Sequence, residues 1–333
     1  MGETAPQPPD VVAESSASGR RGWFRWTALV LGWLAFGAVA VPVLVRLTGY
    51  ERGPLFVIVS LLPWVTFACL VPLLCAALAR SWMLGIVSGF ALVLCLAWLT
   101  PLYTAQGGGD DVVLTAASFN MTVGGADADA VVALVRDSHV DVIAVVELTP
   151  ESREALAAAG LDDVLPYNEV AAEPGITGTG MWSRYPIQNP RPVDGFLSRA
   201  VSAQVQAPGG AFTFYAVHPQ APGPRVHARW TQDMARLKFV LAAASGPVLV
   251  AGDFNGTRDH KAFREIEGLG YADAADQAGA GFLPTFPENR ELWPLVAIDH
   301  VLEGHTGWHA TSVTTTVIPN ADHKAFVVTY AAD

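Results

Sequence analysis

A carboxylate and a carboxamide follow an apolar run in the stretch VLVAGDFN, residues 248–255. The run is typical of a buried strand, and side chains at i and i+2 of an extended backbone point to the same side. Asp253 and Asn255 would then face one site, where Asp253 could orient or deprotonate a water molecule and Asn255 could donate to phosphate oxygens. The same short pattern also fits a loop in which Asp and Asn only cap a turn.

Other polar residues stand at the ends of similar apolar runs. Asn120, Glu147 and His218 each close one, Asp299 lies inside another, and Asp322 with His323 precedes the last. A single carboxylate or amide at a strand end is more often a cap than a functional group. Six such positions, counted with the stretch above, favour one shared site.

The chemistry of these groups is consistent. Mg²⁺ takes carboxylate and amide oxygens, which Glu147, Asp322 and Asn120 could supply, and Mn²⁺ would accept the same ligands. A histidine oriented by a carboxylate, as His323 by Asp299, can transfer protons or stabilise a developing oxyanion near neutral pH. The pattern predicts metal-assisted hydrolysis of a phosphate ester.

The order of the motifs resembles that of the endonuclease/exonuclease/phosphatase superfamily, which includes DNase I, exonuclease-III-like repair enzymes, neutral sphingomyelinases and inositol polyphosphate 5-phosphatases. The resemblance covers about residues 112–331. The last motif, ADH at 321–323, has Ala where Ser is commoner, a change that leaves Asp322 and His323 in place. The other motifs are Asn120, Glu147, GMWSRYP at 180–186, His218, GDFN at 252–255 and IDH at 298–300.

This resemblance implies an α/β fold, a four-layer α/β-sandwich of two mixed sheets flanked by helices. It implies Glu147 as the principal Mg²⁺ ligand, with Asn120 and Asp322 as auxiliary ligands. It also implies that Asp253 and Asn255 handle the nucleophilic water and the phosphate. The catalytic set is then His323, Asp253, Asp299, His218 and Asn255, and the substrate-binding set is Asn255, His218 and Asn120.

The elements that must position these residues follow from the pattern after residue 112. Runs rich in Val and Thr predict strands at 112–119, 142–146, 212–217, 298–302, 311–317 and 326–330. Helical periodicity predicts helices at 127–138, 151–159 and 225–244. Strands interleaved with helices indicate one layered catalytic domain over residues 112–333.

The N-terminal part has the composition of a membrane protein. The whole chain is 51% hydrophobic and only 15% charged. Long runs without charge at 26–45, 54–79 and 82–103 predict three transmembrane helices within residues 23–104. Residues 1–22, which are rich in Pro and Ser, predict a disordered tail, and residues 105–111 predict a short tether.

The basic residues predict the orientation of these spans. Arg20, Arg21, Arg25 and Arg80 fall on one side, and Arg46 and Arg52 on the other. The positive-inside rule places the first group, and with it the tail, in the cytoplasm. We therefore expect a multi-pass protein of the cell membrane with an extracytoplasmic catalytic domain.

Charge and anchoring together favour a lipid substrate. Residues 110–333 carry 27 acidic and 14 basic side chains, a net of −13, which makes binding to nucleic acid unfavourable. A tethered domain meets lipid phosphates at high effective concentration. Three spans before such a domain also resemble the VanJ-type membrane phosphatases linked to glycopeptide resistance. That resemblance implies undecaprenyl pyrophosphate, the cell-wall carrier lipid, as substrate.

Two alternatives stay open. An anchored extracellular nuclease or phosphodiesterase would use the same chemistry on another ester, but it would need basic and aromatic loops, and so acidic a domain offers few. A noncatalytic membrane module that binds a lipid or a partner would be expected to have lost a metal or water-handling residue, and none is missing. The sequence indicates no obligate protein partner.

Overall fold

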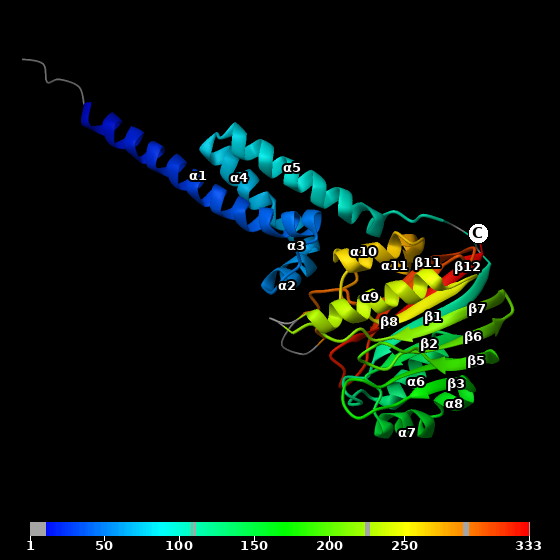
Figure 1. The fold of residues 1–333 in the computed structure, drawn as a ribbon. Helices are drawn as coiled ribbons and strands as arrows, with labels where there is room; N and C mark the ends of the chain where they lie inside the picture. The colour runs from blue at the N-terminus through cyan, green and yellow to red at the C-terminus, as the bar shows by residue number, and fades with distance from the viewer. Residues whose placement is uncertain (1–10, 108, 110, 224–226, 289–292, 333) are drawn as a thin grey trace, which may run out of the picture. The chain divides into compact units, whose positions relative to one another are not determined.

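A computed structural model describes residues 11–107, 109, 111–223, 227–288 and 293–332 (Figure 1). The chain forms two compact units. The first comprises Met1–Leu44 and Leu62–Trp98, and the second comprises Val45–Leu61 and Leu99–Asp333. Residues 1–10 of the predicted tail, and Gly108 and Asp110 of the predicted tether, lie outside the described residues.

Three helical segments are long and apolar enough to cross a membrane: Gly22–Thr48, Leu62–Ala79 and Trp82–Tyr103. They are formed by α1 (Val11–Thr48), by α3 (Leu62–Ala68) with α4 (Leu70–Ala79), and by α5 (Trp82–Leu99) with the 3₁₀ helix η1 (Thr100–Tyr103). Residues 11–22 belong to α1, although their polar composition predicted disorder. The helix begins after Pro9, and the sequence has no proline between Pro9 and Pro42 that would interrupt the helix.

The second predicted span, residues 54–79, is not one helix. Its first seven residues form α2 (Pro54–Ser60), which belongs to the second unit, and the apolar candidate span starts only at Leu62. The apolar side chain of Phe56 in α2 packs inside protein, because it is buried in a core cluster of the second unit.

The first sheet of the second unit has the strand order β11-β12-β1-β2-β4-β3. Strands β1 and β2 are parallel, and every other neighbouring pair in this sheet is antiparallel. The bounds are Val112–Asn120 for β1, Val142–Val146 for β2, Tyr167–Ala171 for β3, Thr179–Ser183 for β4, Trp308–Val317 for β11 and Lys324–Ala332 for β12.

The second sheet has the order β5-β6-β7-β8-β10-β9. It repeats the same design, because β7 and β8 are parallel and the other pairs are antiparallel. The bounds are Ile187–Pro192 for β5, Val201–Ala207 for β6, Gly210–Val217 for β7, Val248–Asp253 for β8, Tyr271–Asp273 for β9 and Asp299–Gly304 for β10.

The two sheets pack face to face around one apolar cluster, which includes Leu114, Phe214, Leu249 and Phe326. Two further clusters fix the outer layers. Helices α6 (Ala128–Asp137), α7 (Pro150–Ala158) and α8 (Leu161–Val164) cover the first sheet, and α9 (Ala228–Ala243) with α10 (Lys261–Glu267) covers the second (Figure 1). The short α11 (Ala274–Ala278) contacts β11. The predicted four-layer α/β-sandwich is confirmed.

Residues 45–61, here called the connector, join the first two candidate spans in the chain and pack within the second unit. Arg46 Nε donates to Asp259 Oδ1 at 2.6 Å, and both side chains are largely buried. The Phe56 ring lies 4.7 Å from the ring of Trp230 and 4.1 Å from that of His260, whose Nε2 donates to the Phe56 carbonyl. This unit is therefore joined to the apolar helices by both ends of the connector as well as by residues 99–111.

We expect Phe56→Ala to lower the free energy of unfolding of this unit by about 3 to 5 kcal/mol, because deleting a buried aromatic ring leaves a cavity. The measurement is thermal unfolding of the detergent-solubilised full chain, followed by near-ultraviolet circular dichroism. Val57→Ala is the matched control, since the adjacent Val57 is 52% exposed. Equal melting temperatures for the two variants would show that the connector adds nothing to this core.

Candidate active site

Four of the predicted site residues stand at the carboxyl ends of the two parallel strand pairs. Asn120 and Asp253 are the last residues of β1 and β8, and Glu147 and His218 directly follow β2 and β7. Asp299 begins β10 opposite Asp253 in the antiparallel register, and His323 immediately precedes β12. The topology therefore brings residues far apart in the sequence to one edge of both sheets, as is usual where parallel strands end.

Gly252 allows β7 and β8 to come together just before the site. A Cβ atom at this position would lie 1.8 Å from the carbonyl oxygen of Val217, which is far closer than any real contact. Only glycine fits, and the adjacent Asp253 is thereby held next to His218, whose Nε2 lies 3.7 Å from Asp253 Oδ2.

His323 and Asp299 form the buried pair that the sequence predicted. His323 Nδ1 donates to Asp299 Oδ2 at 2.9 Å, and His323 Nε2 lies 3.6 Å from Asp253 Oδ2. Burial opposes the charge on His323, but the carboxylates of Asp299 and Asp253 outweigh burial and raise the pKa of the imidazole to about 10. At neutral pH this side chain is a cation whose Nε2–H points toward the other site residues.

His218 has the opposite protonation state. Its Nδ1 donates to the carbonyl of Ile176 at 3.1 Å, so in the neutral ring Nε2 accepts from Asn255 Nδ2, also at 3.1 Å. Burial lowers the pKa of His218 and keeps the ring neutral. The site thus holds one neutral and one charged histidine on two sides of Asp253, an arrangement suited to separate acid and base roles.

Asp253 both caps a turn and faces the site. Its Oδ1 accepts from the backbone N–H of Asn255 at 2.7 Å, and its Oδ2 accepts from Asn120 Nδ2 at 3.1 Å. The expectation of an extended backbone is wrong here, because Asn255 has a φ of 48° and continues the turn. The carboxamide still reaches the site through His218. Burial raises the pKa of Asp253, which makes the carboxylate a stronger base.

Glu147 lies on a strained segment at the end of β2. Its φ is 53°, which is unusual for a residue other than Gly, and its Oε2 accepts from the N–H of Val123 at 2.8 Å. Burial raises the pKa of Glu147, against the hydrogen bonds from Asn120 and Val123, and the nearby Asp322 raises it further. A pair of partly desolvated carboxylates of this kind is stabilised by a cation.

Thr122 connects two of the three predicted metal ligands, Asn120 and Asp322, and sequence reasoning missed it. Its hydroxyl donates to Asp322 Oδ1 at 2.6 Å, and its N–H donates to Asn120 Oδ1 at 2.8 Å. Thr122 and Val123 have φ values of 52° and 53°, so the backbone is strained where it supports the site. The stretch NMTVGG indicates a loop, but no signal in it identifies Thr122.

Two sets of residues could hold a divalent cation. The ligand atoms of Asp253, Asp299 and His323 all lie within 4.8 Å of one another. In that set, however, His323 is protonated and already bonded to Asp299, which fits proton handling better than ligation. The predicted set of Glu147, Asp322 and Asn120 offers the hard oxygen atoms that Mg²⁺ takes, and it is the better fit.

Two aromatic residues that the sequence did not single out support the site from behind. Trp230 Nε1 donates to the Phe254 carbonyl at 2.9 Å and so fixes the turn that follows Asp253. The Phe286 ring packs 4.7 Å from the ring of His323. Phe56 of the connector packs against Trp230, so the connector contacts the residue that fixes this turn.

Comparisons with known proteins bear on the family and the fold. The model of the Endonuclease/Exonuclease/phosphatase family matches residues 117–323. A family structure from Beutenbergia cavernae aligns with a TM-score of 0.52 at 19% identity, over 66% of this chain and 72% of its own. The mannosyl-6-phosphatase of Bacteroides thetaiotaomicron has a TM-score of 0.51 at 14% identity, over 66% of this chain and 99% of its own.

A 3′ phosphatase from Neisseria bound to a product DNA hairpin aligns with a TM-score of 0.52 at 16% identity, over 66% of this chain and 99% of its own. At these identities the structural likeness concerns the fold alone. No curated protein matches the chain by sequence.

We expect Asp299→Asn to destabilise the metal-free protein most below about pH 6.5. The pKa of His323 is about 10 in the folded protein and about 6.5 in the unfolded chain. The pair therefore contributes its whole stabilisation below about pH 6.5, and this contribution is lost as the pH rises through about 10. Breaking a buried pair costs about 3 to 5 kcal/mol. Thermal melting in EDTA between pH 6.5 and 10 measures the penalty, with the exposed Asp194→Asn as control. A penalty independent of pH would contradict the assignment.

Proposed function

Because the chain belongs to the endonuclease/exonuclease/phosphatase family, whose members hydrolyse phosphoester bonds, we propose that it is a membrane-anchored, Mg²⁺-dependent phosphoesterase that acts on a lipid phosphate or pyrophosphate outside the cytoplasm. The observation that carries the proposal is the group formed at one edge of the sheets by a neutral histidine, a charged histidine and the carboxylates between them. Undecaprenyl pyrophosphate is the substrate that we favour.

The residues of the site divide the reaction between them. Asp253 takes the proton of a water molecule whose oxygen attacks the phosphorus atom, while the bond from phosphorus to the leaving phosphate oxygen breaks. His323 donates its Nε2–H to the phosphoryl oxygen on which negative charge grows, and Asn255 with His218 holds the phosphate group in place. Mg²⁺ held by Glu147, Asp322 and Asn120 would neutralise charge on the phosphate oxygens. The products are lipid monophosphate and inorganic phosphate.

Exposed apolar side chains beside the site support an amphiphilic substrate. Val123 is 50% exposed, and its N–H bonds to Glu147. Ile176 is 38% exposed, and its carbonyl bonds to His218. Val317 is 54% exposed and lines a pocket of about 780 Å³ together with Thr122 and Asp322. Exposed apolar groups on separate segments beside a polar site favour a ligand with a lipid chain over a fully polar one.

The N-terminal helices and the charge of the second unit support the same substrate class. Three candidate spans would hold the site close to membrane lipids. The strongly acidic domain would repel a polyanion such as DNA at long range. A lipid pyrophosphate presents only one small anionic group, which a bound cation can compensate.

We expect the detergent-solubilised protein to release phosphate from an isoprenyl pyrophosphate in the presence of Mg²⁺ and to lose this activity in EDTA. Glu147→Ala should abolish turnover because it removes the principal metal ligand. His323→Ala should lower kcat by about 10² to 10⁴. Phosphate release is measured on a panel that also contains a sugar phosphate and plasmid DNA.

Glu154→Ala is the control for this panel, since Glu154 is an exposed carboxylate on α7. Equal or faster turnover of DNA would replace the lipid substrate with the nuclease alternative. No hydrolysis of any phosphate ester would favour a noncatalytic binding module.

The proposed topology has its own test. A protease added to intact cells should remove the region after Tyr103, because the arginine distribution places this region outside the cytoplasm. Loss of the C-terminal region is followed by immunoblot with a cytoplasmic protein as control. Full protection in intact cells, with cleavage only after lysis, would refute the outward orientation.

A further inference from the structure

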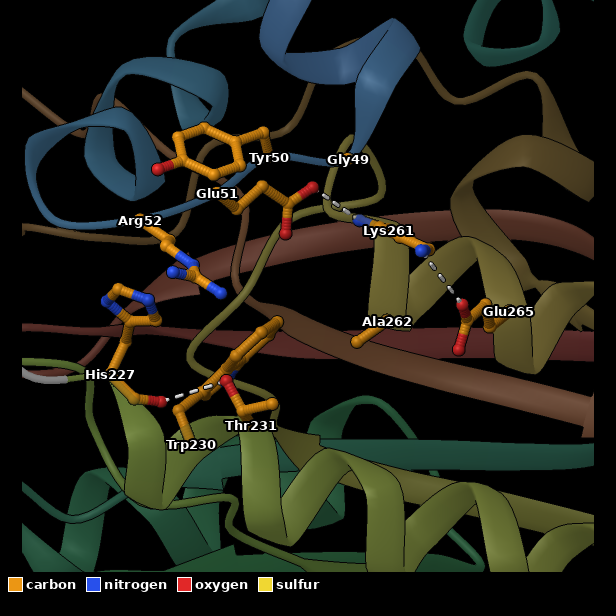
Figure 2. Close-up of a pocket in the computed structure, with 10 residues that line it drawn as sticks. All are labelled: Gly49, Tyr50, Glu51, Arg52, His227, Trp230, Thr231, Lys261, Ala262 and Glu265. Atoms are coloured by element: carbon orange, nitrogen blue, oxygen red, sulfur yellow. Dashed lines mark hydrogen bonds and ion pairs between the residues drawn. The ribbon is translucent and has the colours of Figure 1, made fainter.

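A second pocket lies where the connector meets α9 and α10 (Figure 2). Its volume is about 370 Å³, enough for a small polar headgroup, and none of the predicted catalytic residues lines it. The connector contributes one wall with Glu51 and Arg52. The start of α9 and the start of α10 contribute the others, with His227, Trp230 and Lys261 among the lining residues.

The walls of this pocket are held in place by contacts within the second unit. Glu51 Oε1 accepts from the backbone N–H of Lys261 at 2.7 Å and so joins the connector to α10. The buried pair of Arg46 and Asp259 and the packing of Phe56 hold the connector on both sides of residues 49–53. The pocket is therefore formed before any ligand binds, which lowers the entropic cost of binding.

Two groups in the pocket favour an anion. Figure 2 shows the Arg52 guanidinium extending from the connector toward His227 and Trp230. Within the described part of the chain, the Arg52 guanidinium lies 5.4 Å from the Tyr50 ring and forms no ion pair or side-chain hydrogen bond. His227 Nδ1 is buried and has no hydrogen-bond partner there. A cation thus extends into the pocket toward a residue whose ring holds a buried, unbonded nitrogen.

The carboxylates that line the pocket are already compensated. Glu265 accepts from Lys238 Nζ at 2.9 Å and lies 3.8 Å from Lys261 Nζ. The Glu51 carboxylate is compensated by the N–H of Lys261, which it accepts, while burial raises the pKa of its carboxyl group. Arg52 therefore remains the charge that lacks an opposite partner.

The beginning of α9 adds to this preference. The helix has 16 residues, no acidic residue in its first turn and no side-chain cap at His227. The first N–H groups of such a helix and the positive end of its dipole favour a bound anion. Helix and arginine together point to a phosphate group, because a planar guanidinium and backbone N–H groups both match phosphate oxygens.

We propose that this pocket binds the phosphate group of an anionic membrane lipid. Residues 49–52 follow Thr48, the last residue of the first candidate span, so they belong to the headgroup region of a bilayer that this span crosses. Tyr50, which is 56% exposed, is a residue typical of that region. The inference rests on the proposed membrane location, and not on the identity of the substrate.

The test uses the full chain carrying Glu147→Ala, in neutral detergent with EDTA, so that the candidate active site neither turns over nor holds a metal. Isothermal titration calorimetry compares three probes: dihexanoyl phosphatidylglycerol, dihexanoyl phosphatidylcholine and inorganic phosphate. We expect saturable binding of the phosphatidylglycerol, with affinity at least about tenfold lower for the other two probes. Arg52→Gln should lower the affinity for phosphatidylglycerol at least about tenfold, because the phosphate group loses one charged hydrogen-bond partner.

Arg136→Gln is the matched control, because Arg136 is exposed on α6 and does not line the pocket. Unchanged affinity in Arg52→Gln, with an unchanged melting temperature, overturns the inference, and so does the absence of binding. Equal binding of inorganic phosphate makes the site one for free phosphate and overturns the lipid assignment. Since these titrations involve no turnover, failure of lipid hydrolysis in the unmodified protein would remove the proposed function and leave this result standing.

Discussion

The hydrogen bond between His323 and Asp299 is the interaction on which the site depends, because it joins the two sheets. Asp299 begins β10 in the second sheet, and His323 precedes β12 in the first. Both side chains are buried, and neither charge would be stable there without the other. Packing of the two sheets supplies the burial, and the pair in turn fixes how the sheet edges meet at the site.

The protonation states in the site follow from this arrangement. His323 donates directly to the Asp299 carboxylate and is charged. His218 also lies within 4 Å of the Asp253 and Glu147 carboxylates, but its hydrogen bonds go to a carbonyl and an amide, and burial keeps the ring neutral. The same residue type therefore takes two roles in one site because the neighbours differ. The carboxylates of Glu147 and Asp322 accept hydrogen bonds from the strained segment at Thr122 and Val123, and a cation would relieve their repulsion.

The connector makes part of the N-terminal sequence a component of the second unit. A flexible tether at residues 105–111 would only keep the unit close to the membrane. The buried Phe56 and the pair of Arg46 and Asp259 make residues 45–61 part of the unit itself, in contact with Trp230 behind the turn after Asp253. The segment between the first two candidate spans therefore completes the core next to the site.

The sequence by itself determined the strands that end at or just before Asn120, Glu147, His218 and Asp253, because these depend on local periodicity. The order of its motifs, through the family resemblance, also indicated the sandwich, and the motif residues predicted the pairing of His323 with Asp299. It did not predict β3, β5, β6 or β9, which are short or carry polar residues. It also merged α2 with the following span, since apolar residues look alike whether protein or lipid covers them. Only the tertiary structure decided that Asn255 lies in a turn, that Thr122 links Asn120 to Asp322 and that Phe56 packs against Trp230. These features depend on contacts between distant segments, and no local pattern records which segments will meet.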